Sequence, residues 1–325
     1  DRLPFKGFQA TSLPVAPYFL PATTNVPFIR FRMVALVVSV LLTIGSLTAL
    51  GAMGIKFGID FAGGIQMTIQ VEEGATAEVA DVRAVADGLG LGGARVQEST
   101  GNGLQQYLVA LPLQAGEGLE GETAQREARD ALQAAVLEAF PGITIQSADV
   151  IGGAVSGELV VKGAVAIAVA LLLMLLYIWF RFEWQYSVGA IVALTHDVIA
   201  TIGLFAITQM EFSLSTVAAI LTIVGYSMND TVVVYDRIRE NLRKYKRMEL
   251  SEVLNRSIND TLSRTILTSL TTLVALIALY AIGAGDLKNF AFAMIWGVLI
   301  GTYSSVFVAA PLLLFTKVQR MSDDN

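Results

Sequence analysis

The sequence predicts an α-helical, polytopic membrane protein with six transmembrane helices and one exported α+β domain between the first and second of them. Three observations support this fold class. The 325 residues have a mean hydropathy of +0.62 and only 15% charged residues, whereas a soluble globular chain carries about a quarter. Several apolar stretches are long enough to cross a membrane, which takes about 20 residues in a helix. A single block of soluble composition, residues 53–158, interrupts them.

Six apolar stretches define the expected spans. They are, in chain order, Met33–Ala52, Leu159–Phe180, Gln185–Thr208, Phe212–Asp236, Thr265–Ala284 and Phe290–Phe315. The first span, expected at 33–52, is too long and too late in the chain to be a cleaved signal sequence. The other five fill residues 159–316 with short connections, apart from the segment 237–264.

Lysine and arginine are distributed unequally between the two sides of the expected membrane. With the N-terminus inside, the inner segments hold 15 of the 22 Lys and Arg residues, and such an excess in short loops marks the cytoplasmic side. We therefore expect both termini in the cytoplasm, with a proline-rich segment or linker over 1–32 and a tail over 317–325. Residues 1–29 hold five of the eight prolines, which excludes a regular helix there.

The soluble block alternates strand-like and helix-like patterns. Strands and helices are expected in the order βαββαβ at Phe57–Val71, Thr76–Gly88, Ala94–Glu98, Gln105–Leu111, Thr123–Phe140 and Ile143–Val150, with a hairpin turn at Gly101-Asn102-Gly103. This is the order of the ferredoxin-like fold. The block holds 15 acidic and 5 basic residues. Its acidity is either a solvated exterior or a surface for cationic or unfolded polypeptide.

Several function classes are disfavoured by composition. The chain has no cysteine and a single histidine, so disulfides, thiol catalysis and thiolate metal sites are excluded. The net charge of −6 argues against nucleic acid as a partner. No phosphate-binding loop, nucleotide fold or metal-ligand spacing occurs. We expect no catalytic residues, no cofactor and no metal, and we do not expect an enzyme.

Glycines flank the soluble block at both of its joints with the membrane. They are Gly58, Gly63 and Gly64 after the first span and Gly152, Gly153 and Gly157 before the second. Glycine adopts backbone angles that other residues avoid, so these positions are either hinges between the domain and the spans or simple turns.

Ionisable and polar side chains within the spans are the candidate functional residues, because burying such groups in hydrocarbon is costly. The third span carries His196 and Asp197, and the fourth carries Asn229 and Asp230, with Tyr226 one turn before Asp230 on the same face. The fifth begins near Arg264 and continues with a run of hydroxyls, Thr268, Ser269, Thr271 and Thr272.

Asp230 and Arg264 are expected to enter the membrane from the same side on neighbouring antiparallel helices. A carboxylate in a low dielectric is driven to bind a proton, and a nearby guanidinium opposes this. The pair, with the hydroxyls and ordered water, is therefore either a proton relay or a static ion pair that pins helices together. The lone His196 is either part of the relay or hydrogen-bonded packing.

A further amphipathic helix is expected at about 249–262. Leu250, Val253, Leu254, Ile258 and Leu262 form an apolar stripe that follows the basic run 243–247. This combination predicts a helix on the inner membrane face, unless the basic run is only the usual positive charge of a cytoplasmic loop.

Four ordered motifs resemble the SecF family, the smaller membrane subunit of the SecD–SecF protein-export complex. Gly58-Ile59-Asp60-Phe61-Ala62-Gly63-Gly64 is similar to the family's G-I-D-F-x-G-G signature, and Val224–Asn241 is similar to its long fourth-span motif. Leu194-Thr195-His196-Asp197 and Ser263-Arg264-Thr265 resemble its third-span and fifth-span elements. The resemblance covers residues 28–318. Gly153 stands where the family often has proline.

The resemblance implies a six-span half-module of the resistance-nodulation-division superfamily in a bacterial inner membrane. It implies partnership with SecD, separate or fused upstream of the proline-rich start, and use of the proton gradient to help preproteins leave the SecYEG–SecA translocon. By position, Asp230 would be the titrating carboxylate and Arg264 its switching partner. Supporting relay or packing residues would be Asn229, His196, Asp197, Tyr226, Thr268, Ser269 and Thr272.

Two other function classes remain open. The chain could be half of a proton-coupled efflux or lipid transporter of the same superfamily, which would need a substrate cavity. It could also be a structural subunit in which the carboxylate and the arginine only join helices.

Overall fold

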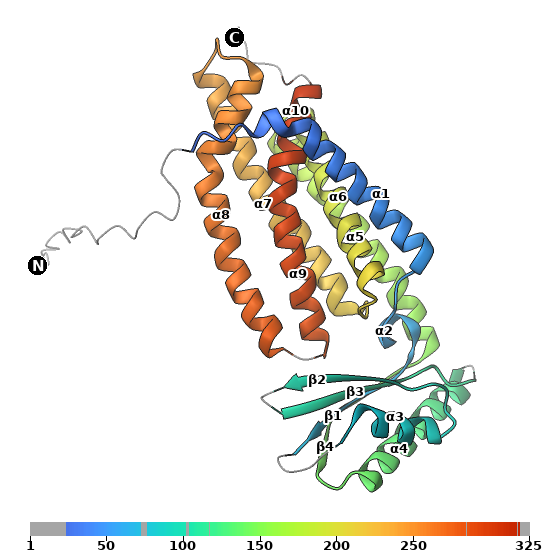
Figure 1. Cartoon of the computed structure of the whole chain (residues 1–325). Helices are drawn as coiled ribbons and strands as arrows, with labels where there is room; N and C mark the ends of the chain where they lie inside the picture. Colours follow the sequence, from blue (N-terminus) through green and yellow to red (C-terminus); the bar gives the residue numbers. More distant parts are fainter. Residues whose placement is uncertain are drawn as a thin grey trace, which may run out of the picture.

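The structure is a computed structural model, and it describes residues 24–316 and 318, apart from 73–76, 102–103, 117 and 284. These residues form a bundle of long helices with a small α/β domain at one end (Figure 1). Of the expected N-terminal segment, residues 1–23 lie outside the described part, and so does the tail except for Val318.

Six helical segments of the described chain are long and apolar enough to cross a membrane, which confirms the predicted fold class. They are η1–α1 (Phe28–Phe31 and Arg32–Met53), α5 (Gly153–Arg181), α6 (Trp184–Thr208), α7 (Leu214–Lys244), α8 (Leu250–Ile282) and α9–η2–α10 (Gly285–Ser304, the π-helical turn Ser305–Ala309, and Ala310–Phe315). Helix α5 begins at Gly153 instead of Leu159, because hydropathy detects only the apolar part of a helix that continues towards the α/β domain.

Helices α6, α7 and α9–α10 form the centre of the bundle. In the most apolar stretch of each helix, the buried share is 61% for α6, 56% for α7 and 61% for α9–α10. It is only 17% for α1, 6% for α5 and 17% for α8. Glycines allow the closest approaches between them: a Cβ added at Gly297 of α9 would lie 2.2 Å from Ile223 Cγ1 of α7. Small residues bring helices together in this way within membranes. The central helices are also those that carry the intramembrane carboxylates.

The helix predicted at about 249–262 is present, but it is the first part of α8 and not a separate helix. Helix α8 runs without a break from Leu250 to Ile282, and its first turns pack on the protein, since Val253, Leu254 and Ile258 are fully buried. Asn241 of α7 donates to Ser257 Oγ at 3.0 Å, and Arg237 pairs with Asp260 at 2.8 Å. The predicted apolar stripe is therefore present, and it packs within the bundle.

The α/β domain confirms the predicted ferredoxin-like order. It consists of β1 (Gly64–Val71), α3 (Val79–Gly88), β2 (Arg95–Gly101), β3 (Leu104–Leu111), α4 (Gly118–Ala139) and β4 (Ile143–Ile151). The sheet is antiparallel throughout, in the order β2-β3-β1-β4. Alternate residues of β1, Ile65, Met67 and Ile69, are fully buried and pack with Val82 and Leu132 of the two helices. The tip of the predicted hairpin turn lies at residues 102–103, outside the described ranges.

The joint between α1 and the domain differs from the predicted strand at Phe57–Val71. Residues Ile59–Ala62 form the short helix α2, and the strand begins only at Gly64. Gly63 and Gly64 both have positive φ, and a Cβ at Gly64 would lie 2.3 Å from the Leu111 carbonyl oxygen. These two glycines are therefore required by turn geometry and close backbone approach, and a hinge role for them stays a prediction.

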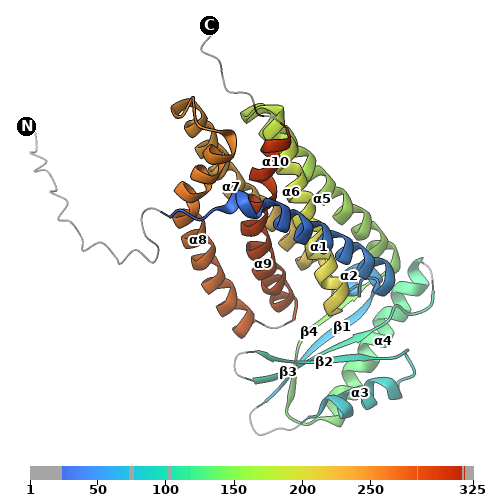
Figure 2. The same ribbon diagram turned by 45° about the horizontal axis from the view of Figure 1, so that its top comes forward.

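The second joint constrains its glycines less, since only at Gly153 would an added Cβ make a tight contact, at 3.0 Å from Leu113 Cδ2. Gly152 is the N-cap of α5, Gly153 begins that helix, and an added Cβ would meet nothing within 4 Å at Gly152 or Gly157. A hinge there also stays a prediction. Both joints lie at one end of the bundle, and α10 and the start of α1 lie at the other (Figures 1 and 2).

Candidate functional site

Asp197 is the most buried carboxylate of the bundle. It lies on α6 with 1% of its surface exposed. One of its oxygens accepts hydrogen bonds of 2.7 Å from Ser227 of α7 and from Ser304 at the end of α9, and His196 Nδ1 lies 3.0 Å from the other. An added Cβ at Gly301 would lie 3.0 Å from Ser227 Cβ, so this glycine lets α9 approach α7 here. Three central helices therefore meet at this carboxylate.

Asp230 of α7 is half-buried and is held by two other hydroxyls. Thr265 of α8 donates to its Oδ1 at 2.6 Å, and Ser305 donates to its Oδ2. Ser305 is the first residue of the π-helical turn η2. Such turns interrupt the regular backbone hydrogen bonding of a helix and are frequent at functional sites. The turn therefore presents its hydroxyl to Asp230 from a locally irregular backbone.

A second set of hydroxyls lies beside these carboxylate contacts, and Ser305 Oγ joins it through the Thr302 carbonyl at 3.0 Å. Ser269 of α8 lies 2.7 Å from Thr302 Oγ1 of α9, and the Tyr226 hydroxyl of α7 donates to Ser269 at 3.4 Å. Hydroxyls both donate and accept, so they can pass a proton or exchange partners without any charged residue.

Arg264 and Asp230 form no direct ion pair among the described residues. Arg264 is exposed, and no ion pair within 4 Å joins the two side chains in the described part of the chain. Consecutive residues of an α-helix point about 100° apart, since a turn takes about 3.6 residues. Because Thr265 faces Asp230, the Arg264 side chain leaves α8 about 100° away around the helix axis and forms no direct pair with the carboxylate.

Three other predicted relay residues also lie outside the network. Asn229 and Thr268 are exposed on α7 and α8, and Thr272 donates to the Thr268 carbonyl of its own helix at 2.9 Å. Of the predicted set, the structure brings together Asp197, His196, Asp230, Tyr226 and Ser269.

Sequence reasoning assigned no role to five side chains of the network. They are the hydroxyl residues Ser227, Thr265, Thr302, Ser304 and Ser305. The one available signal was the Ser304-Ser305 pair within an otherwise apolar span, and serine in a span is usually read as small-residue packing.

Six apolar helices around two carboxylates, with an α/β domain at one end, define a multi-pass membrane protein of the transport class. The chain belongs to the SecF family of protein-export membrane proteins. The profile described as Protein export membrane protein SecD/SecF, C-terminal, matches residues 131–319, and that of the SecD/SecF GG Motif matches residues 48–75.

Similar proteins extend over nearly the whole chain. Protein translocase subunit SecF of Cereibacter sphaeroides is 43% identical over 302 residues, which are 92% of each chain. That of Rhodobacter capsulatus is 43% identical over 307 residues, 93% of this chain and 92% of the relative. The crystal structure of SecDF, a translocon-associated membrane protein from Thermus thermophilus, matches with a TM-score of 0.77 and 34% identity over 92% of this chain. The match covers 39% of that chain, so this chain spans less than half of the solved SecDF.

Proposed function

We propose that this chain, together with SecD, uses the proton gradient to promote late steps of preprotein export through SecYEG–SecA. The relatives named as protein translocase subunits and the translocon-associated SecDF support the export role. The observation that carries the proton coupling is the pair of carboxylates within the bundle, Asp197 and Asp230, whose hydrogen-bond partners among the described residues are hydroxyls and His196.

Asp230 is the proposed proton-binding group. Its two oxygens accept from Thr265 and Ser305, which lie on different segments, α8 and η2. When the carboxylate binds a proton, it becomes a donor at one oxygen, and a hydroxyl there must turn from donor to acceptor. Protonation would therefore alter how α7 is held against α8 and η2.

The start of α7 is the proposed connection between this change and the α/β domain. Asp60 of α2 accepts a 2.8 Å hydrogen bond from the Leu214 backbone N–H in the first turn of α7. Gly58 N donates to the Phe212 carbonyl at 3.0 Å, and Phe212 N donates to the Lys56 carbonyl at 2.9 Å. A movement of α7 would thus be passed to the base of the domain.

The exposed face of α7 and α8 is the proposed contact with SecD. Asn229, Arg264 and Thr268 are exposed there within segments long enough to span a membrane. Polar side chains at membrane depth normally face protein or water and not lipid. We place the assembly in a bacterial inner membrane with both termini in the cytoplasm, following the distribution of Lys and Arg. The chain itself has no enzymatic role in this proposal.

Gradient-driven preprotein translocation into inverted membrane vesicles tests the proposal. Asp230→Asn should remove the part of translocation that depends on the proton gradient and leave the part driven by ATP alone. Asp236→Asn is the matched control, because Asp236 lies on the same helix but is exposed and pairs with Arg181 at 3.2 Å. Unchanged gradient dependence in Asp230→Asn would refute the proposal. Proton flux stimulated by a small ligand without preprotein would favour an efflux or lipid transporter.

A further inference from the structure

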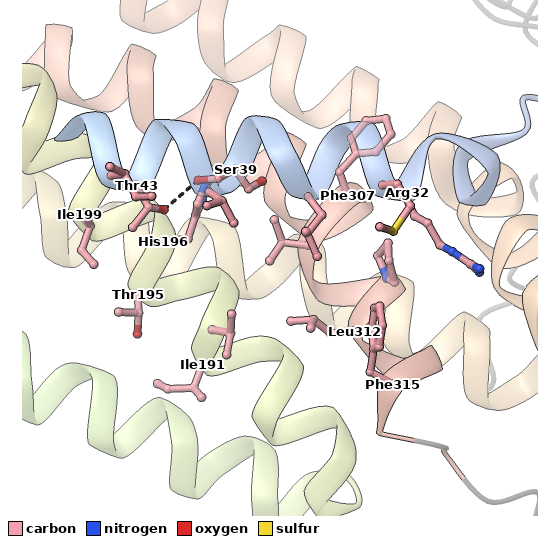
Figure 3. A pocket seen from close by; sticks show the side chains of 17 residues that line it. Arg32, Ser39, Thr43, Ile191, Thr195, His196, Ile199, Phe307, Leu312 and Phe315 are labelled. Atoms are coloured by element: carbon pink, nitrogen blue, oxygen red, sulfur yellow. Dashed lines mark hydrogen bonds between the residues drawn. The ribbon is translucent and has the colours of Figure 1, made fainter. Parts of the chain in front are cut away.

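A pocket outside the carboxylate network lies between α1, α6 and the η2–α10 segment. Its volume is about 430 Å³, which is within the usual range of about 300–1,000 Å³ for ligand pockets. Figure 3 shows Arg32 and Phe315 at one end of it, and Thr43, His196 and Ile199 towards the other end.

The lining of the pocket suits hydrocarbon. Most of it is aliphatic or aromatic, including Leu36, Val40, Ile191 and Leu312. The two hydroxyls that α1 contributes are already engaged: Ser39 Oγ lies 2.9 Å from Tyr303 Oη, and Thr43 donates to the Ser39 carbonyl at 2.8 Å. From α6 the lining adds the Thr195 hydroxyl and His196 Nε2, which is buried and has no hydrogen-bond partner among the described residues. The rest of the lining is apolar apart from Arg32, so a mostly apolar occupant fits the pocket.

Arg32 supplies a charge at the end of the pocket where α1 begins. Apart from His196, it is the only ionisable side chain in the lining, and within the described residues it forms no ion pair within 4 Å. Along α1 the lining runs from Arg32 to Ile44, a rise of about 18 Å at 1.5 Å per residue. The hydrocarbon core of a bilayer is about 30 Å thick, so the pocket is about as deep as one leaflet.

We propose that this pocket binds one anionic phospholipid. Its phosphate headgroup lies against the Arg32 guanidinium, and one acyl chain lies between α1 and α6 and reaches His196. A phosphate suits a guanidinium that has no internal partner, and the length of the groove suits an acyl chain of one leaflet. The bound chain would cover the side of His196 that faces away from Asp197.

Photo-crosslinking in nanodiscs tests this site. The full chain is placed in phosphatidylcholine that contains a trace of phosphatidylglycerol with a diazirine near the end of one acyl chain, and cross-linked peptides are mapped by mass spectrometry. Cross-links should concentrate at the inner end of the pocket, around Ile44 and Ile199. Excess unlabelled phosphatidylglycerol should suppress them, and excess phosphatidylcholine should not.

Two pairs of variants separate the pocket from the general lipid-facing surface. Val40→Phe should block the acyl chain, whereas Val38→Phe should not, because both valines are 47% exposed on α1 but only Val40 lines the pocket. Arg32→Gln should weaken labelling about five-fold, because one basic side chain strengthens binding to an anionic lipid surface by about this factor. Arg181→Gln, at the same end of the bundle, should leave it unchanged.

Three results would overturn the proposal. Labelling spread evenly over all lipid-facing helices would mean annular lipid only, and labelling insensitive to Arg32→Gln would remove the headgroup site. Loss of labelling when SecD is added would mean that a partner helix covers the pocket. Wild type and variants are first compared by thermal unfolding. If either Val40→Phe or Arg32→Gln is misfolded, the other of these two variants decides the test.

Discussion

Ser304 and Ser305 are adjacent in the chain, and each donates a hydrogen bond to a different carboxylate, Ser304 to Asp197 and Ser305 to Asp230. They stand where α9 passes into the π-helical turn η2. The two carboxylates lie on different helices, α6 and α7. One stretch of backbone therefore contacts both acids, and we expect a rearrangement at one acid to change the hydrogen bonding of the other.

Removing the first of these hydroxyls should destabilise the bundle. In Ser304→Ala, the almost fully buried Asp197 loses one of its donors, and leaving a buried polar group short of a partner costs about 1–3 kcal/mol. We expect a free energy of unfolding in detergent that is lower by this amount. Thr208→Ala is the control, because Thr208 is exposed and bonds only to its own helix at Leu204. Equal stability of both variants would contradict the structural role of Ser304.

Removing the second hydroxyl should affect coupling. Ser305→Ala takes one donor from Asp230 and should lower gradient-dependent translocation, while translocation driven by ATP alone continues. The control is Thr271→Ala, whose exposed hydroxyl bonds only to carbonyls of its own helix, at Leu267 and Thr268. If Thr271→Ala reduces the gradient-dependent part as much as Ser305→Ala, the hydroxyl at η2 has no special role.

The contact of α7 with α9 should depend on Gly297. A Cβ there would lie 2.2 Å from Ile223 Cγ1, and overpacking a tight contact typically costs about 1–3 kcal/mol. Gly297→Ala should lower thermal stability accordingly. Gly225→Ala provides the contrast, because nothing lies within 4 Å of a Cβ at that position, and this variant should be neutral or slightly more stable.

Asp60 should stabilise the first turn of α7. Loss of a side chain that accepts from a first-turn backbone N–H costs about 0.5–2 kcal/mol. In Asp60→Ala, hydrogen exchange should be faster at the start of α7, and gradient-dependent translocation should fall. Asp81→Ala, an exposed carboxylate on α3, should change neither. Unaltered exchange at residues 214–217 would exclude the proposed connection.

The α/β domain should lose stability at high pH through Tyr107. Its buried hydroxyl donates to the Ala77 carbonyl at 2.5 Å, and burial, with the nearby carboxylates, raises the pKa of Tyr107 above its ordinary value of 10.0. This stabilisation is complete below pH 10.0 and declines as pH rises through the folded-state pKa, because the unfolded state ionises first.

Tyr107→Phe isolates this effect. The variant should be less stable by about 1 kcal/mol at neutral pH, from the lost hydrogen bond, and the gap to wild type should narrow above pH 10.0. Thermal unfolding of the full chain, followed across that range, gives the comparison. A gap that stays constant with pH would refute the assignment to the Tyr107 hydroxyl.

The spans, the βαββαβ order and the intramembrane carboxylates could be predicted from sequence because each is a local property. A run of about 20 apolar residues indicates a membrane span, and alternation of period two indicates a strand with one buried face. An aspartate within an apolar stretch is costly to bury and indicates a functional residue. Asp197 and Asp230 were found in this way.

The three-dimensional packing determines which hydroxyl meets which carboxylate, that Thr265 and not Arg264 contacts Asp230, and that the stripe of α8 packs within the bundle. These outcomes depend on how each helix is rotated about its axis against its neighbours, and a shift of one residue turns a side chain by about 100°. Composition and periodicity identify the polar residues of a span, but the packing of the neighbouring helices determines their partners.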